Sequence, residues 1–309
     1  ADLSSAGGPA DGQVSDSIFQ EIDLRTGRLL LEWRSLDHIP ITESYKPMGL
    51  PYDYLHLNSI QILPDGNFLV SARHTWALYK LDRRTGQVIW KLGGKRSNFA
   101  MGPDAQFAWQ HDARAISDTQ ITIFDNQSDG PNTNQPQSRG LILNVDNARR
   151  SVTVHRSFHH PQSLLASAMG NVQMLPNGHV FIGWGLASHA TEYTAEGTLV
   201  SDAQLPPKMY SYRVYRSEWR GTPADPPAVA AERDARTGKS TIYVSWNGST
   251  EVDRWQVHAG HRRRHLMTLG VAPRQGFETA IPVGRHPFVA VTALDRFGRR
   301  LARSHTVRT

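Results

Sequence analysis

The chain has 309 residues, of which 39% are hydrophobic and 20% are charged, and its formal net charge is +6. It contains no cysteine, which excludes disulfides, cysteine–zinc sites and thiol nucleophiles. No run of 18 apolar residues occurs, so we expect no membrane-spanning helix. A chain of this size and composition is long enough for one large or two ordinary globular domains.

The positive charge raises the question of a nucleic-acid partner, but the basic residues are dispersed along the chain. The densest run, residues 261–265, lies late in the sequence among strand-like segments. A solvated basic loop is the simpler interpretation of this run, and a phosphate or polyanion site is the alternative. We therefore predict no nucleic-acid partner.

Two sequence motifs recur in the first two thirds of the chain. The sequence Asp-x-Arg-Thr-Gly occupies residues 23–27 and 82–86, each time before an apolar segment, and Thr-Gly predicts a tight turn between two strands. Residues 61–70 (QILPDGNFLV) return as residues 173–182 (QMLPNGHVFI), in which Pro-Asp-Gly or Pro-Asn-Gly joins two apolar strands. Each complete unit thus contains four short antiparallel strands.

Four-stranded units that recur about every 50 to 60 residues are typical of β-propeller blades. We expect blades at 56–95, 107–157 and 163–204, the outer half of another blade at 17–36, and one further strand at 210–219. The smallest propellers have about four blades, and six or more are common. The fold class predicted is therefore all-β with three to four blades, completed by a segment outside this sequence or by an additional chain.

After a proline-rich stretch the pattern changes to longer alternating strands. These segments, which read as half-buried strands of a fibronectin-III-like β-sandwich, are residues 241–246, 254–259 and 288–295. The domains predicted are a flexible N-terminal segment at 1–16, propeller blades at 17–220, a linker at 221–227 and a β-sandwich at 228–309.

Polar residues of two blades are expected to meet at one end of the propeller channel, because the innermost strand of each blade lines that channel. Aligning the blades by their turns, with a shift of 53 residues, places Asn58 and His111 at equivalent positions of their blades. His56 points to the same side as Asn58, since strand side chains repeat every second residue. Arg73, which follows the second strand, leans over the same mouth, whereas His74 is expected on the other face.

These residues carry a resemblance to a known family. The motifs His56-Leu57-Asn58, Arg73 and Gln110-His111 resemble the active-site motifs of the bacterial arylsulfotransferases, which move a sulfuryl group between phenols on a six-bladed propeller. Further phrases resemble the actinobacterial and fungal branch of that family, namely Trp90–Lys95, Phe124–Asn126 and Ser138–Gly140. The similarity runs from about residue 18 to residue 223 and does not include the C-terminal domain.

The resemblance implies an exported enzyme, secreted or periplasmic, that works without PAPS, cofactor or metal on aryl sulfate and phenol small molecules. It implies that His111 is the nucleophile that carries the sulfuryl group and that His56, Asn58 and Arg73 surround the sulfate oxygens. The family also uses a histidine from an earlier blade, so the chain is expected to lack N-terminal blades of the family.

The chemistry suits these residue types independently. Neutral imidazole is a good nucleophile near pH 7, and sulfuryl transfer through a loose transition state spreads negative charge over three oxygens. Arg73 and the Asn58 amide are suitable partners for that charge, and His56 can protonate the leaving phenolate.

Other candidate residues have simpler interpretations. Trp76 and Trp109 either wedge between blades or stack on the aromatic ring of a substrate, and we assign them as substrate-binding candidates. Asp125-Asn126 is interpreted as a turn rather than a calcium loop. His159, His160, His189 and His258 are interpreted as structural histidines. Two alternative functions stay open: a non-catalytic propeller that binds sulfated or aromatic ligands, with the sandwich as adhesion module, and another propeller hydrolase.

Overall fold

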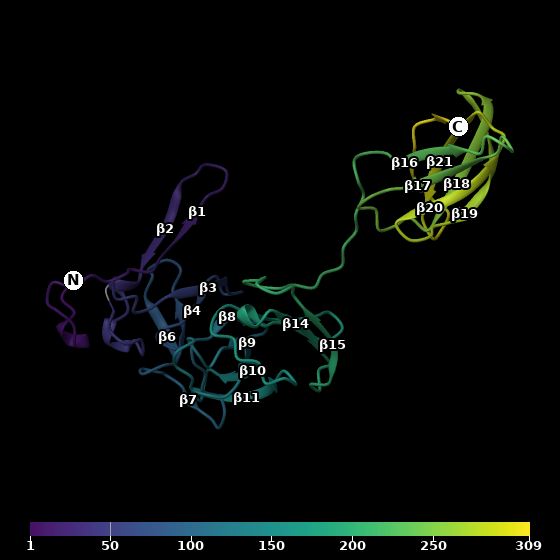
Figure 1. Cartoon of the computed structure of the whole chain (residues 1–309). Coiled ribbons are helices and arrows are strands. Elements are labelled where there is room, and N and C mark those ends of the chain that lie inside the picture. The colour runs from purple at the N-terminus through teal and green to yellow at the C-terminus, as the bar shows by residue number, and fades with distance from the viewer. Residues whose placement is uncertain (50) are drawn as a thin grey trace. The chain divides into compact units, whose positions relative to one another are not determined.

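The computed structural model describes residues 1–49 and 51–309, and its contacts divide the chain into two compact units, Ala1–Arg216 and Ser217–Thr309. The predicted all-β class is confirmed, because the described residues form antiparallel sheets (Figure 1). The helical segments among them are single 3-10 turns: η1 (Ser4–Ala6), η2 (Ser35–Asp37), η3 (Ile41–Glu43) and η4 (Gly185–Ala187). None of the described helices has the length and apolar character required to cross a membrane.

The first unit opens with a two-stranded hairpin and continues with sheets whose strands follow chain order. The hairpin consists of β1 (Ile18–Ile22) and β2 (Leu29–Arg34). The next sheet contains β3 (Leu57–Ile62), β4 (Phe68–Ala72), β5 (Ala77–Leu81) and β6 (Val88–Gly93). The turn between β3 and β4 needs a left-handed residue, and Gly66 supplies it with φ 83°.

Two further sheets complete the first unit. One contains β8 (His111–Ala115), β9 (Gln120–Asp125), β10 (Arg139–Asp146) and β11 (Ser151–Phe158), with the short β7 (Ala100–Met101) parallel to β11. The other contains β12 (Asn171–Met174), β13 (Val180–Gly183), β14 (His189–Tyr193) and β15 (Leu199–Gln204). The first strands of the three sheets are neighbours, since β3 contacts β8 and β8 contacts β12.

Hydrophobic side chains fill the space between successive sheets. One cluster joins Leu69 and Leu92 of the β3–β6 sheet to Ile123 of the next sheet. Another joins Phe124 of the β8–β11 sheet to Trp184, which follows β13. Each fully buried side chain of this size contributes about 1.5 to 3 kcal/mol of transfer free energy, so this packing fixes the three first strands beside one another.

Amide side chains extend the row of first strands. Gln61 of β3 accepts a hydrogen bond from the Ala115 N–H of β8 and donates one to the Ala115 carbonyl. Asn171 of β12 makes the same pair of bonds with Val214. The expectation of a strand over 210–219 is therefore wrong, because side-chain amides rather than a neighbouring strand pair with this backbone.

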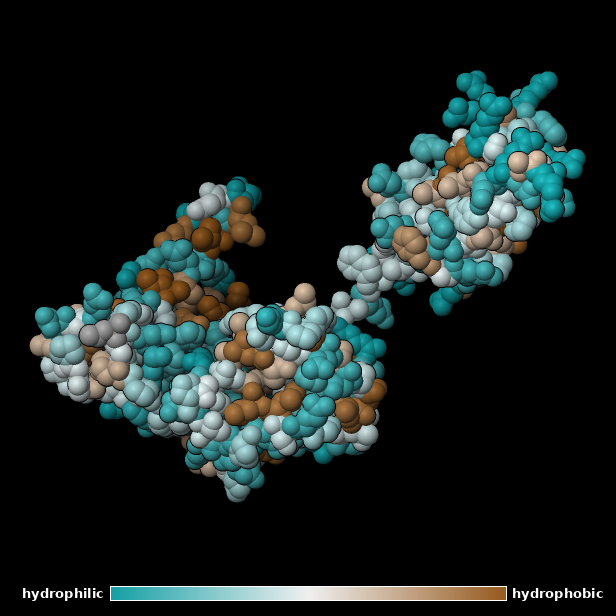
Figure 2. Space-filling view, viewed as in Figure 1, coloured by the Kyte–Doolittle hydropathy of each residue, from teal (hydrophilic) through white to brown (hydrophobic). Residues whose placement is uncertain are grey.

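The β1–β2 hairpin exposes apolar side chains. Leu24 at its turn is 99% exposed, and four further residues of its strands are also exposed: Ile18, Ile22, Leu29 and Leu30. Figure 2 shows hydrophobic residues gathered on this hairpin. A contiguous patch of this kind is uncommon on a soluble monomer.

The second unit consists of two sheets that share one hydrophobic core around Trp255 and Val291. The smaller sheet contains β16 (Ala228–Arg233), β17 (Ser240–Ser245) and β20 (Glu278–Gly284). The larger sheet contains β18 (Arg254–Arg262), β19 (His265–Pro273), β21 (Phe288–Leu294), β22 (Arg300–Arg303) and β23 (Val307–Arg308).

The two units differ in charge. Residues 217–309 contain 15 Lys and Arg against 8 Asp and Glu, whereas residues 1–216 contain 19 against 20. The basic run at 261–265 forms the exposed end of the β18–β19 hairpin. The positive charge of the chain is therefore carried by the second unit.

Candidate active site

His111 begins β8 and is buried, with 3% of its surface exposed. Non-glycine residues with positive φ precede and follow it, Trp109 at φ 52° and Asp112 at φ 53°. Such backbone conformations are unfavourable outside glycine and persist only where surrounding contacts maintain them. The turn that presents His111 is therefore held by its neighbours rather than by local preference.

Hydrogen bonds define the tautomer of His111. Its Nδ1 lies 2.7 Å from Asn126 Oδ1 and 3.1 Å from the Trp109 carbonyl oxygen. The Asn126 amide is oriented by its Nδ2, which donates to the carbonyls of Ala166 and Met169. Because both neighbours of Nδ1 are acceptors, Nδ1 carries the proton and the lone pair of the imidazole is on Nε2.

The imidazole of His111 is neutral near pH 7. Burial is the main cause that lowers the pKa of His111 to about 4. The hydrogen bond to Asn126 acts against this shift, and the nearby charges of Arg73 and His56 add to it. The contact of Nε2 is a hydrogen bond of 3.3 Å from the Met169 N–H, which is longer than usual and correspondingly weak. His111 thus holds an unprotonated ring nitrogen, which is the form required of a nucleophile.

Arg73 is a partly buried guanidinium whose hydrogen bonds in the described part of the chain go to neutral acceptors. Its Nη1 donates to His74 Nε2 at 2.8 Å and its Nη2 donates to the Ser167 carbonyl at 2.8 Å, while its Nε is buried with no partner. Among the described residues, no carboxylate forms a salt bridge with Arg73, and burial lowers its pKa. The charges of Asp129 and Asp53 act against this shift and so offset part of the cost of burying the cation, and a bound anion would offset more of it.

His74 holds Arg73 in place. It is 2% exposed, and its Nδ1 donates to the Asp53 carbonyl at 2.6 Å, which leaves Nε2 as the acceptor for Arg73. Burial lowers the pKa of His74 to about 4, so the ring adds no second charge beside the guanidinium at neutral pH. The expectation that His74 faces away from Arg73 is therefore wrong.

His56 and Asn58 approach the site from the beginning of β3. His56 has φ 56°, and its Nδ1 lies 2.6 Å from a carboxylate oxygen of Asp53. Its ring centroid is 4.8 Å from that of His74. Asn58 Nδ2 donates at 2.7 Å to the carbonyl of Gln110, the residue before the buried histidine, and Asn58 Oδ1 is buried with no partner.

The structure therefore links the four predicted site residues in two ways. His56 and Arg73 are joined through Asp53 and His74, and Asn58 is joined to the backbone beside His111. Direct hydrogen bonds between His111 and the other three predicted residues are absent from the described part of the chain.

The two predicted substrate-binding tryptophans pack against each other. The Trp76 ring stacks on Tyr45 with centroids 3.9 Å apart and meets Trp109 edge to face at 4.7 Å. A cavity of about 110 Å³ lies beside Tyr45 and Trp76. Trp109 is 7% exposed, so Trp76 offers the more accessible ring of the pair.

Four residues near the site were not predicted to be functional from the sequence: Asn126, Asp112, Tyr212 and Arg213. Asn126 was interpreted as part of a turn, and the signal that could have identified it was the Phe124–Asn126 phrase. Its neighbour Asp125 is fully buried and pairs with Arg139 at 2.8 Å. Tyr212 lies edge-on to the His111 ring, with centroids 6.2 Å apart.

Two clusters in the described residues have the composition of metal sites: Asp53, His56 and His74, and His160, His189 and Asp202. In the second cluster the Gln162 N–H donates to His160 Nδ1, so His160 Nε2 carries the proton and donates to Asp202 at 3.1 Å. In the first, both nitrogens of His74 already have partners. Hydrogen bonding accounts for both clusters.

Among solved structures, similar chains include a protein of unknown function from Bacteroides caccae, with 10% identity, coverage of 94% of both chains and a TM-score of 0.38. They also include PQQ-bound aldose sugar dehydrogenase from Streptomyces coelicolor, with 12% identity, coverage of 82% of this chain and 80% of that one, and a TM-score of 0.32.

Sequence comparison is more specific. No curated protein matches the sequence. The family model described as Arylsulfotransferase (ASST) matches residues 1–205, about two thirds of the chain. The chain therefore belongs to the arylsulfotransferase (ASST) family.

Proposed function

We propose that this protein transfers a sulfuryl group from an aryl sulfate to a phenolic acceptor through a covalent sulfohistidine at His111. The observation that carries the proposal is that the unprotonated His111 Nε2 lies near the Arg73 guanidinium, which forms no ion pair with a carboxylate among residues 1–49 and 51–309. The family match supports an arylsulfotransferase-type activity. We assign His111, His56, Arg73 and Asn58 to the reaction.

In the donor step, His111 Nε2 attacks the sulfur atom of the aryl sulfate. The N–S bond forms, the S–O bond to the aryl group breaks, and the phenolate leaves with the electron pair of that bond. The ring becomes a sulfated imidazolium that keeps its Nδ1 proton, and the Asn126 and Trp109 oxygens beside Nδ1 stabilise its positive charge. His56, paired with the Asp53 carboxylate, protonates the phenolate.

In the acceptor step these events run in reverse. His56 takes the proton of an acceptor phenol, the phenolate oxygen attacks sulfur, and the N–S bond breaks to restore neutral His111. Arg73 and the Asn58 amide stabilise the negative charge on the sulfuryl oxygens in both steps. Trp76 and Trp109 are proposed to contact the aromatic ring of the substrate.

We propose that the three sheets of the first unit are blades of a six-bladed ring and that residues 228–309 form a fibronectin-III-like sandwich. The domain boundaries predicted at 16, 220 and 227 stay predictions. The successive sheets in chain order and the exposed apolar hairpin β1–β2 support additional blades, from another segment or chain. We also propose that the protein is secreted or periplasmic and belongs to the actinobacterial and fungal branch.

One observation favours the alternative of a non-catalytic binding protein: the Met169 N–H already occupies His111 Nε2. Incubation with an aryl sulfate and no acceptor distinguishes the two. An enzyme of the proposed type releases one equivalent of phenol per protein and gains the mass of one sulfuryl group on His111. Sulfated product appears when a phenol is then added. Binding without either event would establish the alternative.

The pH dependence of the donor step is a testable consequence of the His111 environment. Since the pKa of His111 is about 4 rather than 6.5, we expect formation of the sulfohistidine to continue below pH 6.5 and to fall as the pH approaches about 4. Phenol release in the first turnover, measured between neutral pH and about pH 4, tests this. A midpoint near 6.5 would contradict the proposed protonation state.

Stability must be measured over the same range. The unfolded chain binds protons on these histidines near pH 6.5, whereas folded His111 and His74 bind them only near 4. The free energy of unfolding should therefore decrease as the pH falls through this window. Thermal unfolding at each pH separates loss of the nucleophile from loss of the fold.

A further inference from the structure

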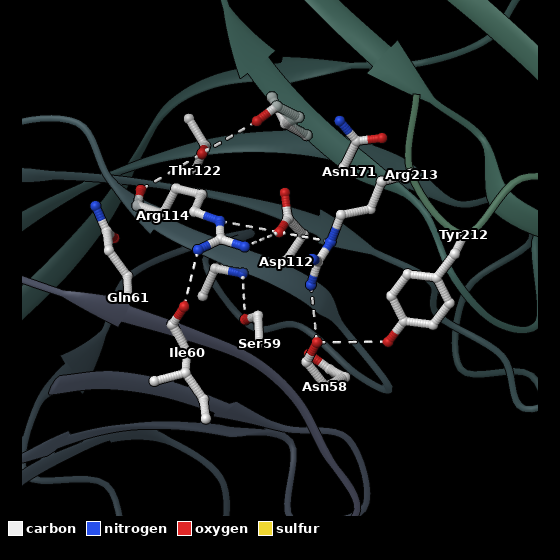
Figure 3. A network of polar contacts seen from close by, with 12 residues as sticks. Asn58, Ser59, Ile60, Gln61, Asp112, Arg114, Thr122, Asn171, Tyr212 and Arg213 are labelled. Carbon is white, nitrogen blue, oxygen red and sulfur yellow. Dashed lines mark hydrogen bonds and ion pairs between the residues drawn. The ribbon is translucent and has the colours of Figure 1, made fainter. Parts of the chain in front are cut away.

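A segment outside the motif-bearing strands reaches the proposed active site. Residues 211–216 follow β15, and Asn171 holds this segment to β12 through two hydrogen bonds with Val214. The Tyr212 carbonyl accepts a hydrogen bond from the Gly170 N–H at 3.1 Å. Figure 3 shows Tyr212 and Arg213 directed from this segment toward Asn58 and Asp112.

Arg213 bridges the backbones that present two proposed site residues. Its Nη2 donates to the Asn58 carbonyl at 2.9 Å, and its Nε lies 2.9 Å from Asp112 Oδ1 (Figure 3). Asn58 is in β3, and Asp112 directly follows His111 in β8. One side chain, about 155 residues away from Asn58 in the sequence, therefore joins the two strands at the level of the site.

The bridge made by Arg213 stabilises Asp112, which is both buried and in an unfavourable backbone conformation. Its side chain is 1% exposed and its φ is 53°, so it combines a buried carboxylate with an unfavourable backbone conformation. Both features require specific contacts to persist. The contacts are ion pairs with Arg114, at 2.7 Å, and with Arg213. Asp112 directly follows His111 in the chain. The ion pair with Arg213 therefore restricts the direction in which the His111 side chain points.

We propose that Arg213 is a positioning residue that holds the Asp112 turn against Asn58, so that His111 Nε2 and the Asn58 amide face one sulfuryl group. The inference rests on the proposed function. Arg213 acts through Asp112 and the Asn58 backbone and does not touch the reacting atoms.

The structure separates this role from simple charge compensation. Arg114 pairs with Asp112 from within β8 and also donates to the Ile60 carbonyl at 3.0 Å. When Arg213 is removed, the buried carboxylate keeps one arginine, and the strands stay joined by Arg114 and by the Gln61 and Asn58 amides. The fold should therefore survive a change that disturbs the orientation of His111.

The test compares Arg213→Met with Arg216→Met. Arg216 belongs to the same segment, but its side chain pairs with Glu192 and its backbone with Gln173, away from Asp112 and Asn58. In Arg213→Met we expect the first-turnover rate of phenol release to fall roughly 10-fold to 100-fold, the scale of a small misplacement of reacting groups. Binding of benzenesulfonate, which cannot transfer a sulfuryl group, should change by less than about 3-fold, and Arg216→Met should keep the parent rate.

Two further measurements complete the test: recovery of the rate by added guanidinium ions, and a spectroscopic signal that does not depend on activity. Added guanidinium ions should restore part of the first-turnover rate in Arg213→Ala, because they can pair with Asp112 in place of the lost side chain. In nuclear magnetic resonance spectra, Arg213→Met should shift the ring resonances of His111, whereas Arg216→Met should leave them unchanged.

The outcomes distinguish the two proposals. If the parent protein never forms sulfohistidine, the proposed function is refuted. In that case the change in the His111 resonances between the parent and Arg213→Met still decides whether Arg213 positions the ring. The inference is overturned if Arg213→Met leaves both the rate and the resonances at parent values. It is also overturned if the rate falls only in proportion to the unfolded fraction, with no rescue by guanidinium.

Discussion

Replacement of His111 by alanine is expected to abolish sulfuryl transfer while leaving ligand binding largely intact. The proposed intermediate is an N–S bond to His111 Nε2, and the ring environment prepares that atom through the proton on Nδ1 and the low pKa. Without the His111 imidazole the N–S bond of the proposed intermediate has no nitrogen at this position, so the loss should be complete rather than graded. The measurements are phenol release in the first turnover and the intact mass after incubation with an aryl sulfate.

A matched histidine variant controls for nonspecific effects of the substitution. His155 lies in β11 and is exposed, so His155→Ala should keep the parent rate and gain the sulfuryl mass. Binding of benzenesulfonate to His111→Ala, within a few-fold of the parent, would show that the site is still formed. Transfer by His111→Ala at the parent rate would refute the assignment of the nucleophile.

The second large effect is expected for Arg73→Ala, which should slow the donor step by about 100-fold or more. Removal of one group that stabilises transition-state charge has effects on this scale. Arg73 holds two donor contacts, to His74 and to the Ser167 carbonyl, which fix the guanidinium plane. Arg73→Lys keeps the charge but not the fork of donors, so it should recover only part of the rate. First-turnover phenol release measures both variants.

The stability of Arg73→Ala distinguishes an anion-binding role from a structural one. Because the guanidinium is partly buried without a carboxylate partner, its removal should leave the thermal midpoint unchanged or raise it. The exposed Arg96 provides a control, and Arg96→Ala should match the parent in both rate and stability. A strongly lowered midpoint together with an unchanged donor step would contradict the proposed role.

The turns and strand alternation were sufficient to predict the all-β class. Thr-Gly and Pro-Asp-Gly place a left-handed residue where a hairpin requires one, and local sequence determines that choice. Residues 210–219 show where local sequence fails. Their alternation predicts a strand, but the partners of this backbone are the side chains of Asn171 and Gln173, which no local pattern reveals.

The site was predicted only in part, because local sequence patterns do not reveal contacts between distant segments. The alternation rule placed His74 on the opposite face from Arg73, but β4 ends at Ala72, so the rule no longer applies to either residue. The blade shift of 53 is close to the observed register, in which Ser59 and Gln61 meet residues 54 positions later. Asn126 and Arg213 reach the site only through the tertiary fold, across 15 residues to His111 and 155 residues to Asn58.

The uneven distribution of charge between the units affects how an anionic substrate reaches the site. Residues 1–216, which contain the proposed site, carry nearly equal numbers of acidic and basic side chains. Their long-range field is therefore weak, and diffusional encounter with an aryl sulfate gains little from electrostatic steering. Attraction begins only within about a Debye length of Arg73, roughly 8 Å at physiological salt. The contribution of residues 1–216 to the association rate should consequently depend little on ionic strength, and their discrimination among sulfates takes place at contact distance.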